Sequence, residues 1–124
     1  DSSNIQDTSK TISNIRKSEI IKDGERYAVM LKGGTHIAVV DALYFKVNSD
    51  SAFNTITEYE TEIKEAFRFI CLTKTKAELT TQQGIDLLKK QIIDATNQII
   101  GYTGERSELG VIDVVLIILT IQDN

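Results

Sequence analysis

Few side chains in this sequence could carry out nucleophilic, acid–base or metal chemistry. The sequence contains a single histidine, His36, and a single cysteine, Cys71. A catalytic triad or a zinc site draws on several such groups, so one copy of the chain cannot assemble a site from several His or Cys ligands. His36 follows a Gly-Gly pair at the expected start of a strand. We interpret it as an exposed histidine beside a turn, with a catalytic role as the alternative.

Two other groups have both a chemical and a structural interpretation. Asp41 falls on the same face of an alternating segment as Val39 and Leu43. It is either an acid placed for chemistry or, as we expect, a β-bulge residue or a paired carboxylate. Cys71 has no second cysteine to pair with, and we expect it to be a small buried residue in a helix. The sequence has no P-loop, dinucleotide-binding glycine motif, zinc-protease helix or calcium loop, so we predict no enzyme, no cofactor and no metal.

The composition is that of a soluble globular domain, with 41% hydrophobic and 26% charged residues among 124. This length supports one hydrophobic core. The formal net charge is −4. Binding to nucleic acid relies on clustered cations, so we predict no nucleic-acid partner. The longest apolar run, Val114 to Leu119, is far shorter than the roughly 20 residues that span a bilayer.

Near residue 25 the sequence changes from predominantly polar residues to alternating apolar residues. Residues 1–24 are polar and predict a tether, with a docked N-terminal element as the alternative. Alternating apolar residues over 27–31 and 37–47, on either side of Gly33-Gly34, predict a β-hairpin. The cluster from Asn48 to Ser51 predicts a turn and the start of a helix.

The second half predicts two helices and a final strand. Helical spacing of apolar residues begins after Ser51 and continues to about residue 70, and it recurs over 81–100 before Gly101. Thr75 and Glu78 have the spacing of a capping box, which allows a short extra helical turn between the helices. Residues 102–110 predict a loop, and the β-branched segment 111–122 predicts a strand. We therefore predict an α+β domain over residues 25–124, with a small antiparallel or mixed sheet.

The last strand is apolar on both faces, unlike the first two. Such a strand must be covered on both sides, and the two helices cover one of them. A second copy of the protein could cover the other side, and the alternative is that helix 81–100 or residues 1–24 cover it. We predict that self-association uses residues of this strand and of the strand 35–47: Ile117, Ile118, Val115, Leu119 and Tyr44.

Three segments of the chain have an order and spacing typical of a known family. The first is the hairpin sequence from Tyr27 through Gly33-Gly34 to Phe45, and the third runs from Asp113-Val114 to Ile121-Gln122. Between them lies Lys74-Thr75-x-x-Glu78-Leu79, followed by Thr81-x-x-Gly84. This second segment is similar to the KT-x-x-EL-(S/T)-x-x-G segment of the FliL family of flagellar basal-body-associated proteins, which the three segments together resemble. Two departures indicate a divergent lineage: Gln82-Gln83 stands where the family usually has proline, and Ile117-Ile118 stands where relatives are more often polar.

The resemblance implies a fold similar to that of stomatin-type (SPFH) proteins and a non-enzymatic scaffold. Family members are anchored in the bacterial inner membrane by one helix, with this domain in the periplasm. They assemble around or beside the stator units of the flagellar motor, as a ring-like homo-oligomer when anchored, and support swimming or swarming. Residues 1–24 would then follow an anchor upstream of Asp1. The alternative function is a periplasmic module that binds a peptide or another ligand along an exposed strand edge.

Overall fold

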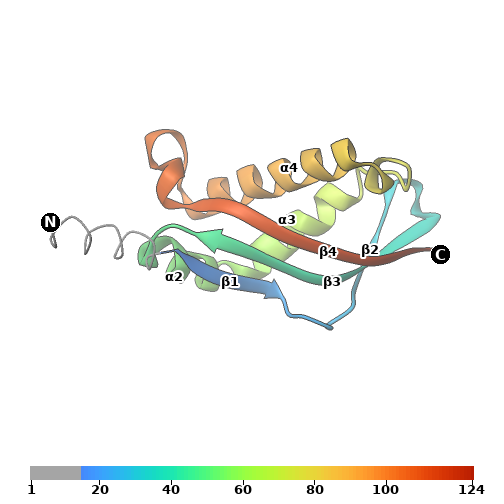
Figure 1. Ribbon diagram of the computed structural model, residues 1–124, viewed down its shortest axis with the longest axis horizontal. Coiled ribbons are helices and arrows are strands. Elements are labelled where there is room, and N and C mark those ends of the chain that lie inside the picture. Colours follow the sequence, from blue (N-terminus) through green and yellow to red (C-terminus); the bar gives the residue numbers. More distant parts are fainter. Residues whose placement is uncertain (1–14) are drawn as a thin grey trace, which may run out of the picture.

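The computed structural model describes residues 15–124, so residues 1–14 of the tether predicted over residues 1–24 lie outside this range. Its sheet is built around one long central strand, β3 (His36–Val47). Strand β4 (Val111–Asp123) pairs along one edge of β3, while β1 (Arg16–Ile21) and β2 (Tyr27–Met30) share the other edge. All the pairings are antiparallel. With its helices, this sheet confirms the predicted α+β class (Figure 1).

The strand β1 is the first difference from the sequence-based expectation. It lies within residues 1–24, which were predicted to be a tether, so over Arg16–Ile21 the alternative of a docked N-terminal element holds. Ile20 and Ile21 are buried, and Ile21 pairs opposite Leu43 of β3. These two neighbouring isoleucines supply the apolar contact that holds a short, otherwise polar segment on the sheet.

The β2–β3 hairpin matches the prediction. A single 3₁₀ turn, η1 (Lys32–Gly34), connects the two strands, and Gly33 and Gly34 adopt φ angles of 83° and 74°. Side chains with a Cβ atom rarely take this left-handed conformation, which explains why the turn uses two glycines.

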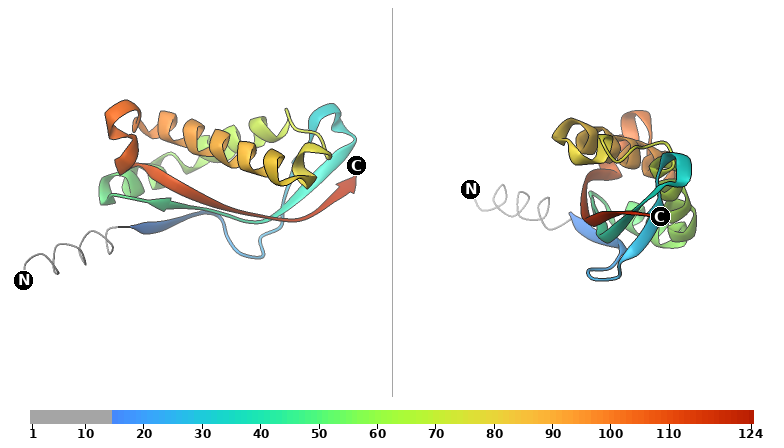
Figure 2. Two further views of the ribbon diagram at one scale, coloured as in Figure 1. Left: turned by 45° about the horizontal axis from the view of Figure 1, so that its top comes forward. Right: turned by 90° about the vertical axis from the view of Figure 1, so that its right-hand side faces the viewer.

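Three α-helices lie on one side of the sheet: α2 (Asp50–Glu58), α3 (Glu60–Cys71) and α4 (Gln82–Ile100) (Figure 2). The side chain of Ser49 caps α2 by accepting a hydrogen bond from the amide of Ala52. The helix predicted over 51–70 is divided at Tyr59, whose φ and ψ of −104° and 23° leave the helical range. No glycine or proline marks this break. It allows α2 to pack on β1 and α3 on β2 of a twisted sheet.

The connection between α3 and α4 is a capped turn, as the spacing of Thr75 and Glu78 predicts. The carboxylate of Glu78 accepts hydrogen bonds from the amide and hydroxyl of Thr75, and the Thr75 hydroxyl accepts one from the Glu78 amide. The 3₁₀ turn η2 (Glu78–Thr80) follows. Thr81 then caps α4 by accepting from the amide of Gly84, and Gly101, with φ of 83°, ends this helix.

Hydrogen bonds hold β4 at both of its ends. At the start, the buried Asn97 of α4 accepts from the amide of Val111 at 2.8 Å and donates to its carbonyl at 3.1 Å. At the other end, the amide of Asn124 donates to the Thr35 carbonyl, and its side chain donates to the Gly34 carbonyl. The 3₁₀ segment η3 (Gly104–Leu109) occupies the predicted loop before β4.

Candidate functional site

Bulges in the β3–β4 pairing decide which face each apolar side chain of β4 occupies. The register leaves Ile112 and Leu119 as extra residues of β4, and Asp41 as an extra residue of β3. The predicted bulge at Asp41 is therefore confirmed. Each bulge shifts the in-out alternation by one residue, so a simple period of two along β4 does not give the faces.

The sheet has an open face, opposite the helices, that carries apolar side chains of β4. Val115 stands opposite Tyr44 in the register, and Ile117 stands opposite Ala42. The Ile117 side chain is 45% exposed, and that of the bulge residue Leu119, two positions further along β4, is 51% exposed. Within residues 15–124, no helix covers this face (Figure 2). We call Tyr44, Val115, Ile117 and Leu119 the open-face patch.

One end of the open face is polar. Lys17 of β1 lies 4.2 Å from the centroid of the Tyr44 ring and 3.9 Å from the Glu19 carboxylate. Lys46 and Asp113 form a second exposed ion pair at 3.9 Å. The apolar part of the face is therefore limited on one side by charges of both signs.

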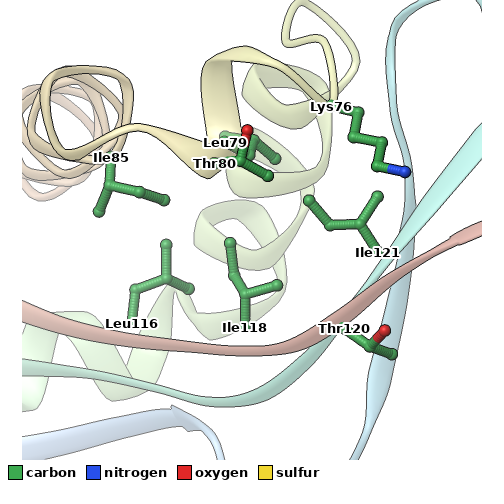
Figure 3. Close-up of a pocket in the computed structure, with 8 residues that line it drawn as sticks. All are labelled: Lys76, Leu79, Thr80, Ile85, Leu116, Ile118, Thr120 and Ile121. Carbon is green, nitrogen blue, oxygen red and sulfur yellow. The ribbon is translucent and has the colours of Figure 1, made fainter.

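Ile118 lies on the other face from Ile117, so the structure separates these two predicted interface residues. Its half-buried side chain points with that of Leu116 toward Ile85 at the start of α4 (Figure 3). Thr120 turns away from them. Three of the five predicted interface residues, Tyr44, Val115 and Ile117, thus share the open face, Leu119 is an exposed bulge residue further along β4, and Ile118 faces the helical layer.

A groove of about 450 Å³ lies between β4 and the segment that connects α3 to α4. Figure 3 shows its lining, in which side chains from β4 face those from η2 and α4. The lining residues are mostly apolar: Lys76, Leu79, Thr80, Ile85, Leu116, Ile118, Thr120 and Ile121. The sequence did not predict this groove, because it forms between segments about 40 positions apart in the chain, and only their packing brings them together.

One end of the groove is formed by the capped turn, where Lys76 is the charged residue of the lining. The Thr75 amide and hydroxyl lower the pKa of the Glu78 carboxyl, and Lys74 and Lys32 lower it further. Lys76 has no ion-pair partner among residues 15–124. Its ammonium group extends over Ile121 at the rim of the groove (Figure 3).

The groups considered for chemistry lie apart from one another. His36 contacts Thr35, and its Nε2 atom lies 3.4 Å from the exposed Asp123 carboxylate. No cluster of three or more His, Cys, Asp or Glu side chains suited to a metal occurs in the described range. Every helix within residues 15–124 is too short or too polar to span a bilayer.

Cys71 is 2% exposed at the end of α3, which confirms the prediction of a small buried residue. Burial raises the pKa of its thiol to about 12, and the charge of Lys74 lowers it slightly. We expect a thiol-specific disulfide reagent at pH 8 to modify the native protein at least about a hundredfold more slowly than the urea-unfolded protein, because attack requires an exposed thiolate. Equal rates in both states, measured by absorbance, would contradict this burial.

The raised pKa of the Cys71 thiol also affects the stability of the protein at high pH. The folded pKa lies above the unfolded value of about 8.5, so the folded state retains the proton longer. The contribution to stability is fully present below the unfolded pKa and is lost as the pH rises toward 12. A Cys71→Ala variant should lose less stability than the parent protein over this range.

The described domain is thus a small α+β unit whose most distinctive features are an apolar sheet face and a groove. Residues 21–122 match the family described as flagellar basal body-associated protein FliL. Because the match covers most of the chain, the chain belongs to the FliL family, and the resemblance seen in the sequence is confirmed. Comparison with curated proteins gives no match.

Proposed function

We propose that this protein is a non-enzymatic scaffold of the flagellar motor that associates with copies of itself through the open-face patch. Membership of the FliL family associates the chain with the flagellar basal body. The observation that carries the proposal is the pair of half-exposed side chains, Ile117 and Leu119, on a sheet face without a helical cover. A scaffold needs a surface that excludes water on contact, and these side chains provide one.

The contact between two copies is weak by itself. Burying the exposed halves of two such side chains contributes on the order of 1–3 kcal/mol, which corresponds to association at roughly 10 mM or weaker. An anchor in the inner membrane, with this domain in the periplasm, raises the local concentration into that range. We infer that copies anchored in this way surround or flank the stator units as a ring-like homo-oligomer and support the torque that drives swimming or swarming.

The substitution Ile117→Asp in the chromosomal gene tests this proposal. We expect the protein to fold, since the side chain is already 45% exposed, while swimming in soft agar falls by at least half. Leu87→Asp, at a 48%-exposed position of α4, is the matched control because it makes the same chemical change on the helical side. Normal swimming by the Ile117→Asp strain at an unchanged protein level would rule out this face as an interface.

Cross-linking measures the association directly. Cysteine is introduced at position 119 (Leu119→Cys) in a Cys71→Ala background, so that the only thiol lies in the open-face patch. In membranes of the motile strain we expect an oxidised dimer on a non-reducing gel, and we expect the added Ile117→Asp change to abolish it. A dimer band that persists in the Ile117→Asp background would place the contact elsewhere.

A further inference from the structure

The outer edge of β4 carries no paired strand in the described range. β4 pairs only with β3, over nearly its whole length. The amide of Val114 donates to the Asp113 carboxylate at 2.9 Å, so this amide points away from the ladder with β3. The amides of a strand alternate in direction, and from Val114 to Ile118 no extra residue interrupts β4 itself, because the bulge opposite Ile117 and Ile118 places its extra residue, Asp41, on β3. The amides of Leu116 and Ile118 therefore also face the free edge.

The groove lies beside this same stretch of β4. Leu116 and Ile118 line it with their side chains, and their main chains form the free edge. Leu79 of η2 and Ile85 of α4 form the opposite wall. A strand added to the edge would place every second side chain, about 7 Å apart, on the groove side. Main-chain donors and apolar pockets thus occur at one place, which is the arrangement that binds extended peptides.

We propose that this edge and groove bind an extended segment of a partner protein as an added antiparallel strand along Val114–Leu119. The segment has apolar β-branched side chains at alternate positions and an acidic side chain near its amino end. In the antiparallel orientation, that end lies next to Ile121, where Lys76 extends without an ion-pair partner among residues 15–124. A carboxylate there would pair with the Lys76 ammonium group.

The surroundings of the edge favour a peptide over a second folded copy. Seen end-on, the first turns of α4 lie above β4 and toward the side away from β2 (Figure 2, right). Two copies paired through β4 edges about a two-fold axis perpendicular to the sheet would bring both α4 helices to the same side of the joined sheet, close to the shared edge. A single extended chain needs only the width of one strand, about 4.8 Å. This site lies on the edge and helical side of β4 and does not depend on the open-face patch.

The test uses a short acetylated peptide that begins with glutamate and has valine at every second position, with threonine or serine between. Fluorescence polarisation of the labelled peptide with the whole chain should show saturable binding. The same peptide with lysine in place of glutamate should bind about tenfold more weakly. N-methylation of the main-chain amides that face β4 should remove binding, because the ladder bonds are lost. Absence of saturation would overturn the proposal, as would equal binding of the N-methylated peptide.

A charge reversal makes the test specific to this groove. In Lys76→Glu, the preference should invert, so that the lysine peptide binds more tightly than the glutamate peptide. Lys90→Glu changes the net charge by the same amount on an exposed position of α4 and should leave the preference unchanged. An unaltered preference in Lys76→Glu would overturn the assignment of the acidic end. A dimer of the chain at micromolar concentration, dissociated by the peptide, would assign the edge to a second copy instead.

Discussion

Replacing Asn97 with alanine is expected to lower the free energy of unfolding by about 2–4 kcal/mol, measured by urea denaturation followed by circular dichroism. Asn97 and Val111 are both buried, and two hydrogen bonds of 2.8 and 3.1 Å join them. Alanine would leave the amide and the carbonyl of Val111 without partners in the core. A buried polar group that loses its partner costs about 1–3 kcal/mol, and this change affects two of them.

Two further variants separate this effect from a general weakening of α4. Gln98→Ala removes a neighbouring amide side chain that is exposed and should cost less than about 0.5 kcal/mol. Asn97→Asp keeps the acceptor for the Val111 amide but loses the donor and buries a charge, so it should be at least as destabilising as alanine at neutral pH. A loss below about 1 kcal/mol for Asn97→Ala would show that β4 does not depend on this contact.

The second large effect is expected at Gly84, in the first turn of α4. A Cβ atom at this position would overlap the carbonyl oxygen of Glu78, which belongs to the backbone and cannot rotate away. Gly84→Ala should therefore cost about 3 kcal/mol or more, or prevent folding. At a helix position with room for a methyl group, the same change would raise the free energy of unfolding by up to about 1 kcal/mol. The sign of the change therefore shows whether Gly84 is in close contact with the Glu78 backbone.

Thermal unfolding of Gly84→Ala and of Gln83→Ala checks this expectation. Gln83 is exposed in the same turn, and its alanine variant should unfold within a few degrees of the parent. An unchanged or raised midpoint for Gly84→Ala would mean that η2 and α4 separate more easily than their packing indicates.

Local signals in the sequence predicted most elements of this fold. The glycine pair between two alternating segments predicted the hairpin, and the threonine, glutamate and glycine residues predicted the caps. These features depend on residues within a few positions of each other. The sequence predicts a tether in place of the strand β1, because this strand is stabilised by the burial of Ile20 and Ile21 in a core formed by distant segments. The division at Tyr59 was missed for the same reason, since the twist of the sheet, rather than a local breaker, determines it.

The candidate surfaces could also be predicted only in part, because they depend on contacts between residues far apart in the sequence. The sequence indicated that the last strand is apolar on both sides, but its three nearby bulges decide which residues share a face. Ile117 and Ile118 were grouped as neighbours and lie on opposite sides. The groove depends on the distance between η2 and β4, which no residue pattern encodes by itself.

The position of the two outer strand ends determines how this domain resists mechanical force. Arg16 begins β1 at one end of the long axis, and Asp123 ends β4 at the other (Figure 1). A pull on these two points is directed along the strands, so it shears the β1–β3 and β3–β4 ladders. Under shear, the interstrand bonds bear the load together, whereas a pull across the strands would open them one at a time. Tension applied between these two ends thus loads the domain in its most resistant direction.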